Sequence, residues 1–335
     1  MLKEYTKFYY SALPSNKKEI YRKIYDALSV RCKTIEILVD TSVLTRDELI
    51  EIVMAIYNDT PSFYYVQITS ISYTVTRSGY IITPNYLYSG EQIKKLDAQL
   101  EQGLQRFKSK YITPSMNEYE REKVIHDFLV KTITYDYEAL SVMGGRVDEI
   151  YNVLGALLKK KAVCWGIACA FKLLCDYCQI KSLVVIGNTI PIQGDAGHAW
   201  NMVKLDGETY HVDVTWDIKE KGDISFCYDY LNLSDSLMRM NHTWESTLYP
   251  KCNAIKYNYY YRNHLYVKTV DELVEYVAKK LCRAEHYIAV KFANSMPTKK
   301  EIEDGIRKGF QKASRCASYS YLISEETHNI YVEII

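Results

Sequence analysis

The stretch Ala162-Val163-Cys164-Trp165-Gly166-Ile167-Ala168-Cys169-Ala170-Phe171 decides the fold class of this 335-residue chain. It follows the basic run at residues 159–161 and predicts an apolar helix that begins at or just after Cys164. A cysteine at a helix start faces unpaired backbone N–H groups and the positive end of the helix dipole, which favour thiolate over thiol. The same N–H groups can bind the oxyanion of a tetrahedral intermediate. We therefore interpret Cys164 as a candidate nucleophile.

The plain alternative is that Cys164 is one more buried thiol, because a free cysteine usually behaves as a small hydrophobic residue. The chain has nine cysteines, an odd number without a regular framework, which favours free thiols over a disulfide scaffold. Cys175 and Cys178 match a C-x-x-C pattern, but they lie well inside the predicted helix, away from its activating end. We expect neither redox chemistry nor metal binding at this pair.

A second stretch, residues 197–216, predicts a β-hairpin with arms at 197–205 and 210–216. Both arms are rich in β-branched and aromatic residues, and Asp206-Gly207 between them is a favoured two-residue turn. We expect Leu205 and Glu208 to flank this turn. A loop of two or four residues keeps the resulting alternation of faces, whereas a loop of three residues would reverse it.

In this register His198, Trp200 and Asp213 share one face, and His198 and Asp213 are diagonal neighbours within reach of a hydrogen bond. Asp213 would then hold one ring nitrogen of His198 and leave the other facing the thiol of Cys164. His211 shares this face but has no comparable carboxylate, so we rank it below His198. The alternatives are a structural histidine at position 198 and a strand-edge or capping carboxylate at position 213.

These motifs resemble the bacterial transglutaminase-like superfamily, which has a papain-like cysteine fold. The resemblance covers about residues 115–250 and rests on the segments 162–166, 197–201 and 210–217, with support from 125–136, 230–235 and His242. It implies an α+β core in which the helix that bears the nucleophile packs on an antiparallel sheet. It also implies that Cys164 is the nucleophile, His198 the general base and Asp213 the orienting acid.

The same resemblance extends to a candidate substrate site. Trp165 after the cysteine resembles true transglutaminases, and we expect Trp165, Gly166, Gly197 and Trp200 to bind substrate. Members of the superfamily include transglutaminases, peptide deglycosylases, cysteine peptidases and inactive relatives. The resemblance therefore supports the mechanism better than the substrate.

The length of the chain allows appendages around such a core. We expect a small α/β region at residues 1–110, the catalytic core at 111–255 and a small α+β appendage at 256–335 with the order β-α-β-α-β-β. Periodicity also predicts a strand over 64–76 and, after a break at Gly144-Gly145, a helix over 148–159.

Composition and charge argue against several classes of function. Hydrophobic residues make up 48% and charged residues 25% of the chain, as in globular proteins. The formal net charge of +1, without a basic stripe, argues against binding of nucleic acid or an anionic membrane. No apolar run approaches the ~20 residues of a bilayer span, and Met1–Tyr10 lacks the apolar core of a secretion signal. The sequence reads as cytoplasmic as it stands, or as secreted if a leader has been removed.

We therefore expect a cysteine enzyme that attacks an amide bond of a peptide or protein through a thioester, with no cofactor and no metal. Water or an amine would resolve the thioester. One alternative is a catalytically silent module that binds peptides or proteins. Another is a zinc enzyme with His198, His211 and Asp213 as ligands. The sequence does not indicate the oligomeric state.

Overall fold

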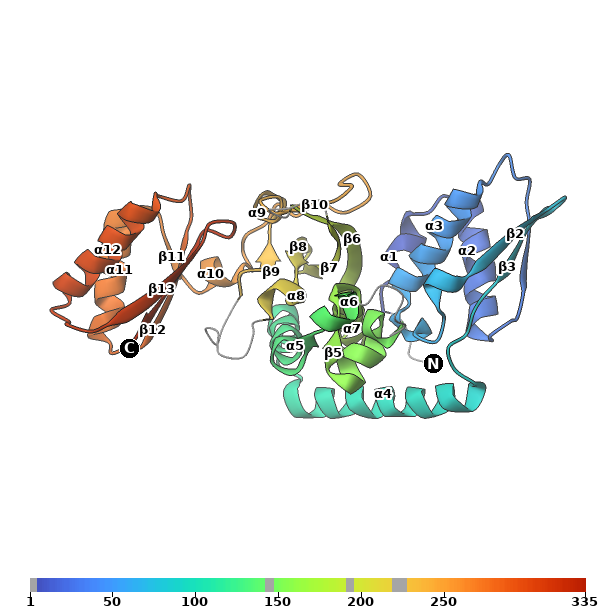
Figure 1. Ribbon diagram of the computed structural model, residues 1–335, viewed down its shortest axis with the longest axis horizontal. Coiled ribbons are helices and arrows are strands. Elements are labelled where there is room, and N and C mark those ends of the chain that lie inside the picture. Colours follow the sequence, from blue (N-terminus) through green and yellow to red (C-terminus); the bar gives the residue numbers. More distant parts are fainter. Residues whose placement is uncertain (1–4, 142–147, 191–195, 219–227) are drawn as a thin grey trace.

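The computed structural model describes residues 5–141, 148–190, 196–218 and 228–335. Figure 1 shows three parts along the long axis. The N-terminal part and the C-terminal part each have a small sheet with helices, and a five-stranded sheet lies between them. The long helix α4 (Gly90–Tyr111) runs beneath the N-terminal and central parts. Helices and mainly antiparallel sheets together give the α+β class that the sequence predicted. Among the described residues we find no helix whose length and apolar character would suit a membrane span.

The N-terminal part is a three-stranded antiparallel sheet packed against helices. Its elements are α1 (Phe8–Ala12), α2 (Ser15–Ser29), β1 (Ile35–Leu38), α3 (Arg46–Asp59), β2 (Ser72–Thr76) and β3 (Gly79–Thr83), with the strand order β1-β3-β2. The strand predicted over 64–76 is wrong in its first half, which follows the 3-10 turn η1 at residues 61–63 and contains the 3-10 turn η2 at residues 68–70. Pro61 fixes the backbone of the first turn, and the buried Tyr64 and Tyr65 pack into the core without joining the sheet.

The central part is an antiparallel sheet with the strand order β10-β6-β7-β8-β9. These strands are β6 (Lys181–Thr189), β7 (Ala196–Leu205), β8 (Glu208–Val212), β9 (Leu231–Leu233) and β10 (His242–Thr243). Helix α7 (Cys164–Tyr177) packs on β6 and β7, and α5 (Glu118–Thr132) packs against α7. Residues 166–176 of α7 are buried throughout, which fixes the helix against the sheet.

Short elements connect α5 to α7. They are β4 (Thr134–Tyr135), α6 (Tyr137–Ser141), η3 (Asp148–Tyr151), η4 (Gly155–Lys159) and β5 (Lys161–Ala162). The single helix predicted over 148–159 is wrong, because it is split into a 3-10 turn and a π-helical turn. The side chain of Asn152 accepts a hydrogen bond from the backbone N–H of Leu154 and so competes with a continuous helix. The predicted break at Gly144-Gly145 lies outside the described residues.

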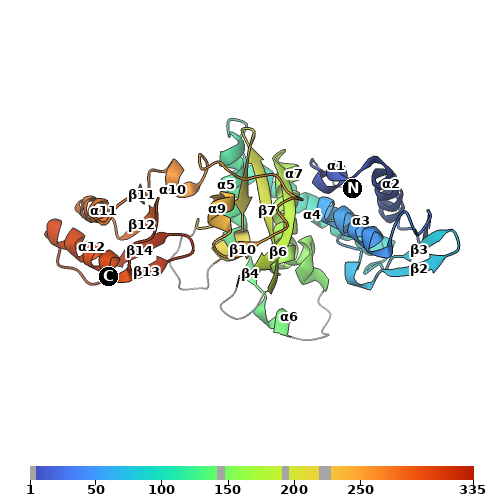
Figure 2. The same ribbon diagram turned by 90° about the horizontal axis from the view of Figure 1, so that it is seen from above.

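The C-terminal part has the predicted β-α-β-α-β-β order, preceded by a short helix α10 (Tyr259–Arg262). Its elements are β11 (Tyr266–Val267), α11 (Val270–Cys282), β12 (Tyr287–Phe292), α12 (Lys299–Lys312), β13 (Tyr319–Ser324) and β14 (Asn329–Ile334). The strand order is β11-β12-β14-β13, and Figure 2 shows this part from above.

The buried apolar residues divide differently from the predicted domains. One continuous cluster runs from Tyr21 of α2 to Tyr257 and joins the N-terminal part to the central part. The C-terminal part has a separate cluster around Leu273, Val290 and Ile306. The division at residues 110 and 255 stays a prediction.

Candidate active site

Cys164 is the first residue of α7 and is half-buried. The residue before it, Val163, makes no side-chain cap hydrogen bond to the helix end. Seven other described helices have such a cap, and the capping residues are Thr45, Ser89, Asn117, Asp213, Asn258, Thr269 and Thr298. The amide groups at the start of α7 are therefore not satisfied by an N-cap side chain, which leaves room for an anion there.

One of these amides has a partner that the sequence analysis did not single out. Strand β4 pairs with β5 so that Tyr135 lies beside Ala162, and the backbone N–H of Cys164 donates to the Tyr135 hydroxyl. Burial raises the pKa of Tyr135, so the hydroxyl stays protonated. It is therefore available as a hydrogen-bond donor beside the thiol. In the sequence Tyr135 belonged only to a stretch that resembled the family.

Gly166 lies in the first turn of α7, where another part of the chain approaches closely. A Cβ added there would lie 2.3 Å from the carbonyl oxygen of Ile150 and 3.1 Å from that of Asn152. The protein's own backbone fills this space, so glycine is needed for packing. A substrate contact at Gly166 stays a prediction.

The hairpin after β6 has the predicted turn and register. Leu205 pairs with Glu208, and the positive φ angles of Asp206 and Gly207 form the tight turn between them. The second arm is shorter than predicted, because β8 ends at Val212 and residues 214–217 form the short helix α8.

Asp213 is the N-cap of α8 as well as a neighbour of His198. Its Oδ1 accepts from the backbone N–H groups of Thr215 at 2.9 Å and Trp216 at 3.3 Å. Asp is among the preferred N-cap residues, which explains why the strand stops there. These two bonds hold the carboxylate so that Oδ2 faces β7.

His198 lies between Asp213 and Cys164. Its Nε2 is 2.7 Å from Oδ2 of Asp213, and its ring also makes a hydrogen bond with the Cys164 thiol. Because a carboxylate can only accept, Nε2 donates to Asp213 and Nδ1 is left for the thiol. Burial alone would lower the pKa of His198, but the Asp213 charge and the two hydrogen bonds raise it to about 10. The carboxyl pKa of Asp213 is held well below its usual range, against the effect of burial, by His198 and His242.

His242 is a further partner of Asp213, and the sequence analysis named it only as part of the resemblance and gave it no role in the site. Its Nε2 lies 3.2 Å from Oδ2 of Asp213, and its ring is buried against Trp200. Burial lowers the pKa of His242, so its ring is neutral beside the carboxylate. His242 reaches this position because β10 pairs with β6 beside Gly187, where a Cβ would collide with the carbonyl oxygen of Thr243.

His211 does have a carboxylate partner, contrary to the prediction. Its Nε2 is 2.9 Å from Oδ1 of Asp235, and its Nδ1 accepts from the indole N–H of Trp200 at 3.0 Å. Because indole can only donate, Nδ1 carries no proton and Nε2 must donate to Asp235. Burial lowers the pKa of His211, which agrees with this neutral form.

The zinc alternative loses its proposed ligand set. His211 groups with Asp235 and Cys252, whereas His198 and Asp213 group with His242. In addition, Nε2 of His211 carries the proton of its bond to Asp235 and has no free lone pair for a metal. The structure therefore does not bring His198, His211 and Asp213 together as one metal site.

The remaining substrate-binding candidates differ in their surroundings. Trp165 is half-buried, and its indole N–H donates to the side chain of Asn58 in α3 at 3.1 Å. Gly197 is exposed, with open space where a Cβ would be. Trp200 is only 1% exposed and packs between His211 and His242, so a substrate could not reach it in this arrangement. Trp200 therefore supports the two histidines in this arrangement, and its expected substrate role stays a prediction.

His126 and Asp217, the last residue of α8, form a further buried histidine–carboxylate pair. Nε2 of His126 is 2.9 Å from Oδ2 of Asp217, and Asp217 also accepts from the backbone N–H of Tyr230. Burial opposes the charge of His126, but Asp127 and Asp217 raise its pKa to about 9. Because Asp217 ends the helix that Asp213 begins, this pair fixes the segment that carries the carboxylate.

Comparison with known proteins places these residues in a family. The model of the transglutaminase-like superfamily matches residues 105–214, the segment that contains Cys164, His198 and Asp213. This chain carries a domain of the transglutaminase-like superfamily.

A curated relative of this transglutaminase-like domain is the Kyphoscoliosis peptidase of Mus musculus. It is 27% identical over 136 residues, a match that covers 37% of this chain and 20% of the mouse protein. The chain therefore spans about a fifth of the length of that relative.

Two solved structures also match parts of the chain. A candidate cysteine protease from Cytophaga hutchinsonii is 12% identical with a TM-score of 0.28, covering 44% of this chain and 61% of that one. A structure described as a TGase is 13% identical with a TM-score of 0.31, covering 59% of this chain and 54% of that one.

Proposed function

We propose that the transglutaminase-like domain catalyses acyl transfer or hydrolysis at an amide bond of a peptide or protein, with Cys164 as the nucleophile. The observation that carries the proposal is the bridging position of His198, hydrogen-bonded to Asp213 at 2.7 Å and to the Cys164 thiol. The uncapped start of α7 supports it, because free amides there can stabilise negative charge.

In the first half of the reaction the sulfur attacks the amide carbonyl carbon and the carbonyl oxygen becomes an oxyanion. His198, which has taken the thiol proton, gives it to the nitrogen of the leaving amine as the C–N bond breaks. A thioester to Cys164 results. Asp213 holds the ring of His198 in one tautomer and stabilises its charged form.

In the second half water or an amine attacks the thioester. His198 removes a proton from the attacking group, the C–S bond breaks, and the sulfur recovers its proton. The product is an acid if water attacks and a new amide if an amine attacks. The same three residues serve both outcomes, so the acceptor depends on what enters the site.

The proposal is tested by the rate at which iodoacetamide labels each thiol of the intact chain, read by peptide mass spectrometry. Cys282 and Cys316 are exposed and provide a reference within the same molecule. We expect Cys164, although half-buried, to react faster than both, and His198→Ala to remove this advantage without changing the two reference rates. Labelling of Cys164 no faster than Cys282, or a rate that survives loss of His198, would contradict the proposal.

The alternative is a silent domain that binds peptides or proteins. The surroundings of Trp165 favour this alternative. Its indole N–H donates to Asn58 and its ring packs against Tyr57, so α3 of the N-terminal part fixes the start of α7. Under this alternative the Cys164→Ala chain would still bind its protein partner in a pull-down. The unaltered chain would turn over no substrate in a screen of amides.

A further inference from the structure

The outer edge of the C-terminal sheet is the feature that carries a further inference. Strand β13 is last in the order β11-β12-β14-β13, and it pairs with β14 from Tyr319 opposite Ile334 to Ser324 opposite Asn329. In the part of the chain that the structure describes, no strand pairs with its other edge. Such an edge presents a row of unpaired backbone N–H and C=O groups.

Natural proteins usually protect an open edge with a charged residue, a proline or a bulge. Strand β13 reads Tyr319-Ser-Tyr-Leu-Ile-Ser324 and has none of these, since its ladder with β14 is regular. Tyr321 and Leu322 at its centre are 36% and 50% exposed. An uncharged, regular and exposed edge of this length favours pairing with another strand.

Charges of opposite sign lie at the two ends of β13. Arg315 precedes the strand, and Glu325 and Glu326 follow it directly. All three side chains are exposed, and within the described residues none of them has an ion-pair partner. The strand therefore has a basic end and an acidic end, and neither end is paired with an opposite charge in the part of the chain that the structure describes.

We propose that β13 pairs in antiparallel fashion with β13 of a second copy of this chain, about a two-fold axis perpendicular to the sheet. The antiparallel arrangement brings the basic end of each strand beside the acidic end of the other. Arg315 of each copy then faces Glu325 and Glu326 of the other copy, and this contact occurs twice. The two four-stranded sheets join into one continuous sheet.

The register of this pairing follows from the symmetry. A two-fold axis perpendicular to a sheet keeps each face on its own side, so residues on the same face must oppose one another. Tyr319 and Ile323 both pack against the helices, and with Tyr321 on the axis they oppose each other across the interface. Beyond the paired strands, the turn at residues 325–328 of one copy lies beside the segment of the other copy that contains Arg315 and Ala317.

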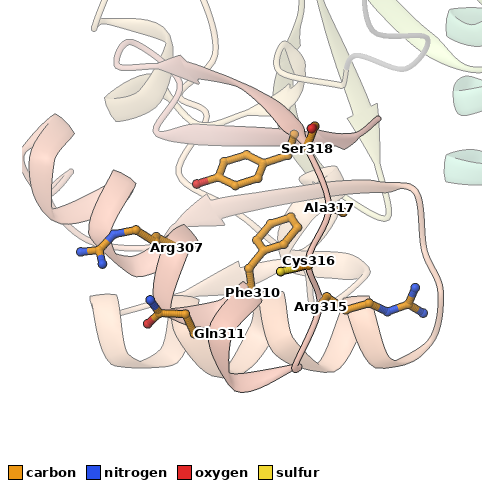
Figure 3. A pocket seen from close by; sticks show the side chains of 8 residues that line it. Arg307, Phe310, Gln311, Arg315, Cys316, Ala317 and Ser318 are labelled. Carbon is orange, nitrogen blue, oxygen red and sulfur yellow. The ribbon is translucent and has the colours of Figure 1, made fainter.

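Ala317 lines a hollow that could receive an acidic side chain of the second copy. The hollow has a volume of about 410 Å³ and lies between α12 and the segment that leads into β13. Figure 3 shows Arg307 and Arg315 on either side of it, with Phe310 and Cys316 between them. Arg307 is already paired with Asp304 at 2.7 Å, so Arg315 is the cation that a carboxylate from the second copy would meet there.

The outer strand of the N-terminal sheet provides a matched comparison. Strand β2 (Ser72–Thr76) is also uncharged and exposed at its edge, with Val75 59% exposed. It is followed by Arg77, but the residues before it, 69–71, carry no charge. Antiparallel self-pairing of β2 would bring no opposite charges together, so the same argument does not extend to this strand.

The experiment is sedimentation velocity of the full chain over a range of concentrations, at low and high salt. We expect a reversible dimer that weakens as salt rises, because the end contacts are ionic. Arg315→Glu alone, or Glu325→Arg with Glu326→Arg, should each raise the dissociation constant by about tenfold or more. Arg77→Glu, the matched control on β2, should leave it unchanged.

Mixing the two charge variants provides the decisive measurement. The first variant is acidic at both ends of β13 and the second is basic at both ends, so the mixture should form a heterodimer more tightly than either variant forms a homodimer. A chain that stays monomeric at every soluble concentration would overturn the proposal, and so would a dimer that the charge variants leave intact. Cys164→Ala should dimerise like the unaltered chain, which separates this result from the proposed function.

Discussion

The ring of His242 lies against the carboxylate of Asp213, with its Nε2 3.2 Å from the same Oδ2 that His198 approaches. His242 must donate from Nε2, so a neutral ring has a lone pair at Nδ1. That atom is 2.6 Å from Oδ1 of Asn241, and Nδ2 of Asn241 donates to the hydroxyl of Tyr230 at 2.6 Å. Two acceptors cannot share a hydrogen bond, so we exchange the two ends of the Asn241 amide, which are assigned from their partners. Its N–H then donates to Nδ1 and its oxygen accepts from the Tyr230 hydroxyl, and every group in the chain from Tyr230 to Asp213 has a partner.

This chain makes His242 a positioning residue for the candidate triad. We expect His242→Ala to lower the rate of Cys164 alkylation about tenfold or more, because Asp213 loses a buried hydrogen bond that holds its orientation. The pH at which His198 titrates should change as well, which a purely structural loss would not produce. His242→Gln keeps a donor and should recover part of the rate. An unchanged rate in correctly folded His242→Ala would show that His198 alone positions the carboxylate.

The buried histidines should titrate in two groups, which imidazole nitrogen chemical shifts can measure. The pKa of His198 is raised to about 10 and that of His126 to about 9, so both rings stay charged at neutral pH. The pKa values of His211 and His242 are lowered, so both rings are neutral there. Asp213→Asn should move the titration of His198 to lower pH and leave His126 in place. A neutral His198 in the unaltered chain at neutral pH would contradict this assignment.

Local patterns predicted the parts of the site that depend on neighbouring residues. The two-residue turn at Asp206-Gly207 set the register, and the register put His198 and Asp213 on one face. The early end of β8 was missed because Val214, Thr215 and Trp216 have strong strand propensity, while the capping preference of Asp213 prevails in the fold.

The partners that sequence reasoning missed are distant in the chain. His242 follows Asp213 by 29 residues and arrives through pairing of β10 with β6. Asp235 follows His211 by 24 residues. Neither contact can be read from the spacing of residues in the sequence. Each depends on the order of the strands in the sheet, whereas the sequence shows only the alternation of faces within one strand.

Glu122 should make the stability of the protein depend on pH. Glu122 is fully buried, and its Oε2 accepts from the side-chain amide of Asn232 at 3.1 Å. Two oxygens have no hydrogen-bond partner among the described residues: Oε1 of Glu122 and Oδ1 of Asn232. One proton on Oε1 would satisfy both oxygens by donating to Oδ1. Burial raises the pKa of Glu122 to about 7, which agrees with a protonated group.

The sign of the pH effect follows from this raised pKa. The contribution to stability is fully present below the unfolded value of 4.5 and is lost as pH rises to about 7. Glu122→Gln supplies a permanent N–H donor, so we expect it to stabilise the protein above neutral pH by on the order of 2–3 kcal/mol and to flatten the pH dependence. Urea unfolding at several pH values measures this, with the exposed Glu51→Gln as control. Equal loss of stability at every pH in Glu122→Gln would count against a protonated Glu122.

Gly166 and Gly197 should respond in opposite ways to substitution by alanine. A Cβ at Gly166 would meet the carbonyl oxygen of Ile150 at 2.3 Å, and backbone cannot move aside as a flexible side chain can. We expect Gly166→Ala to cost about 1–3 kcal/mol or more in unfolding free energy, as overpacking does. Relief of the collision would shift the start of α7, so Cys164 should also be alkylated more slowly. Gly197→Ala has open space and should change stability little, which makes it the matched control beside His198. Urea unfolding and alkylation rates measure both effects, and a Gly166→Ala chain with unaltered stability and rate would refute the close packing of residues 150–152 against the helix start.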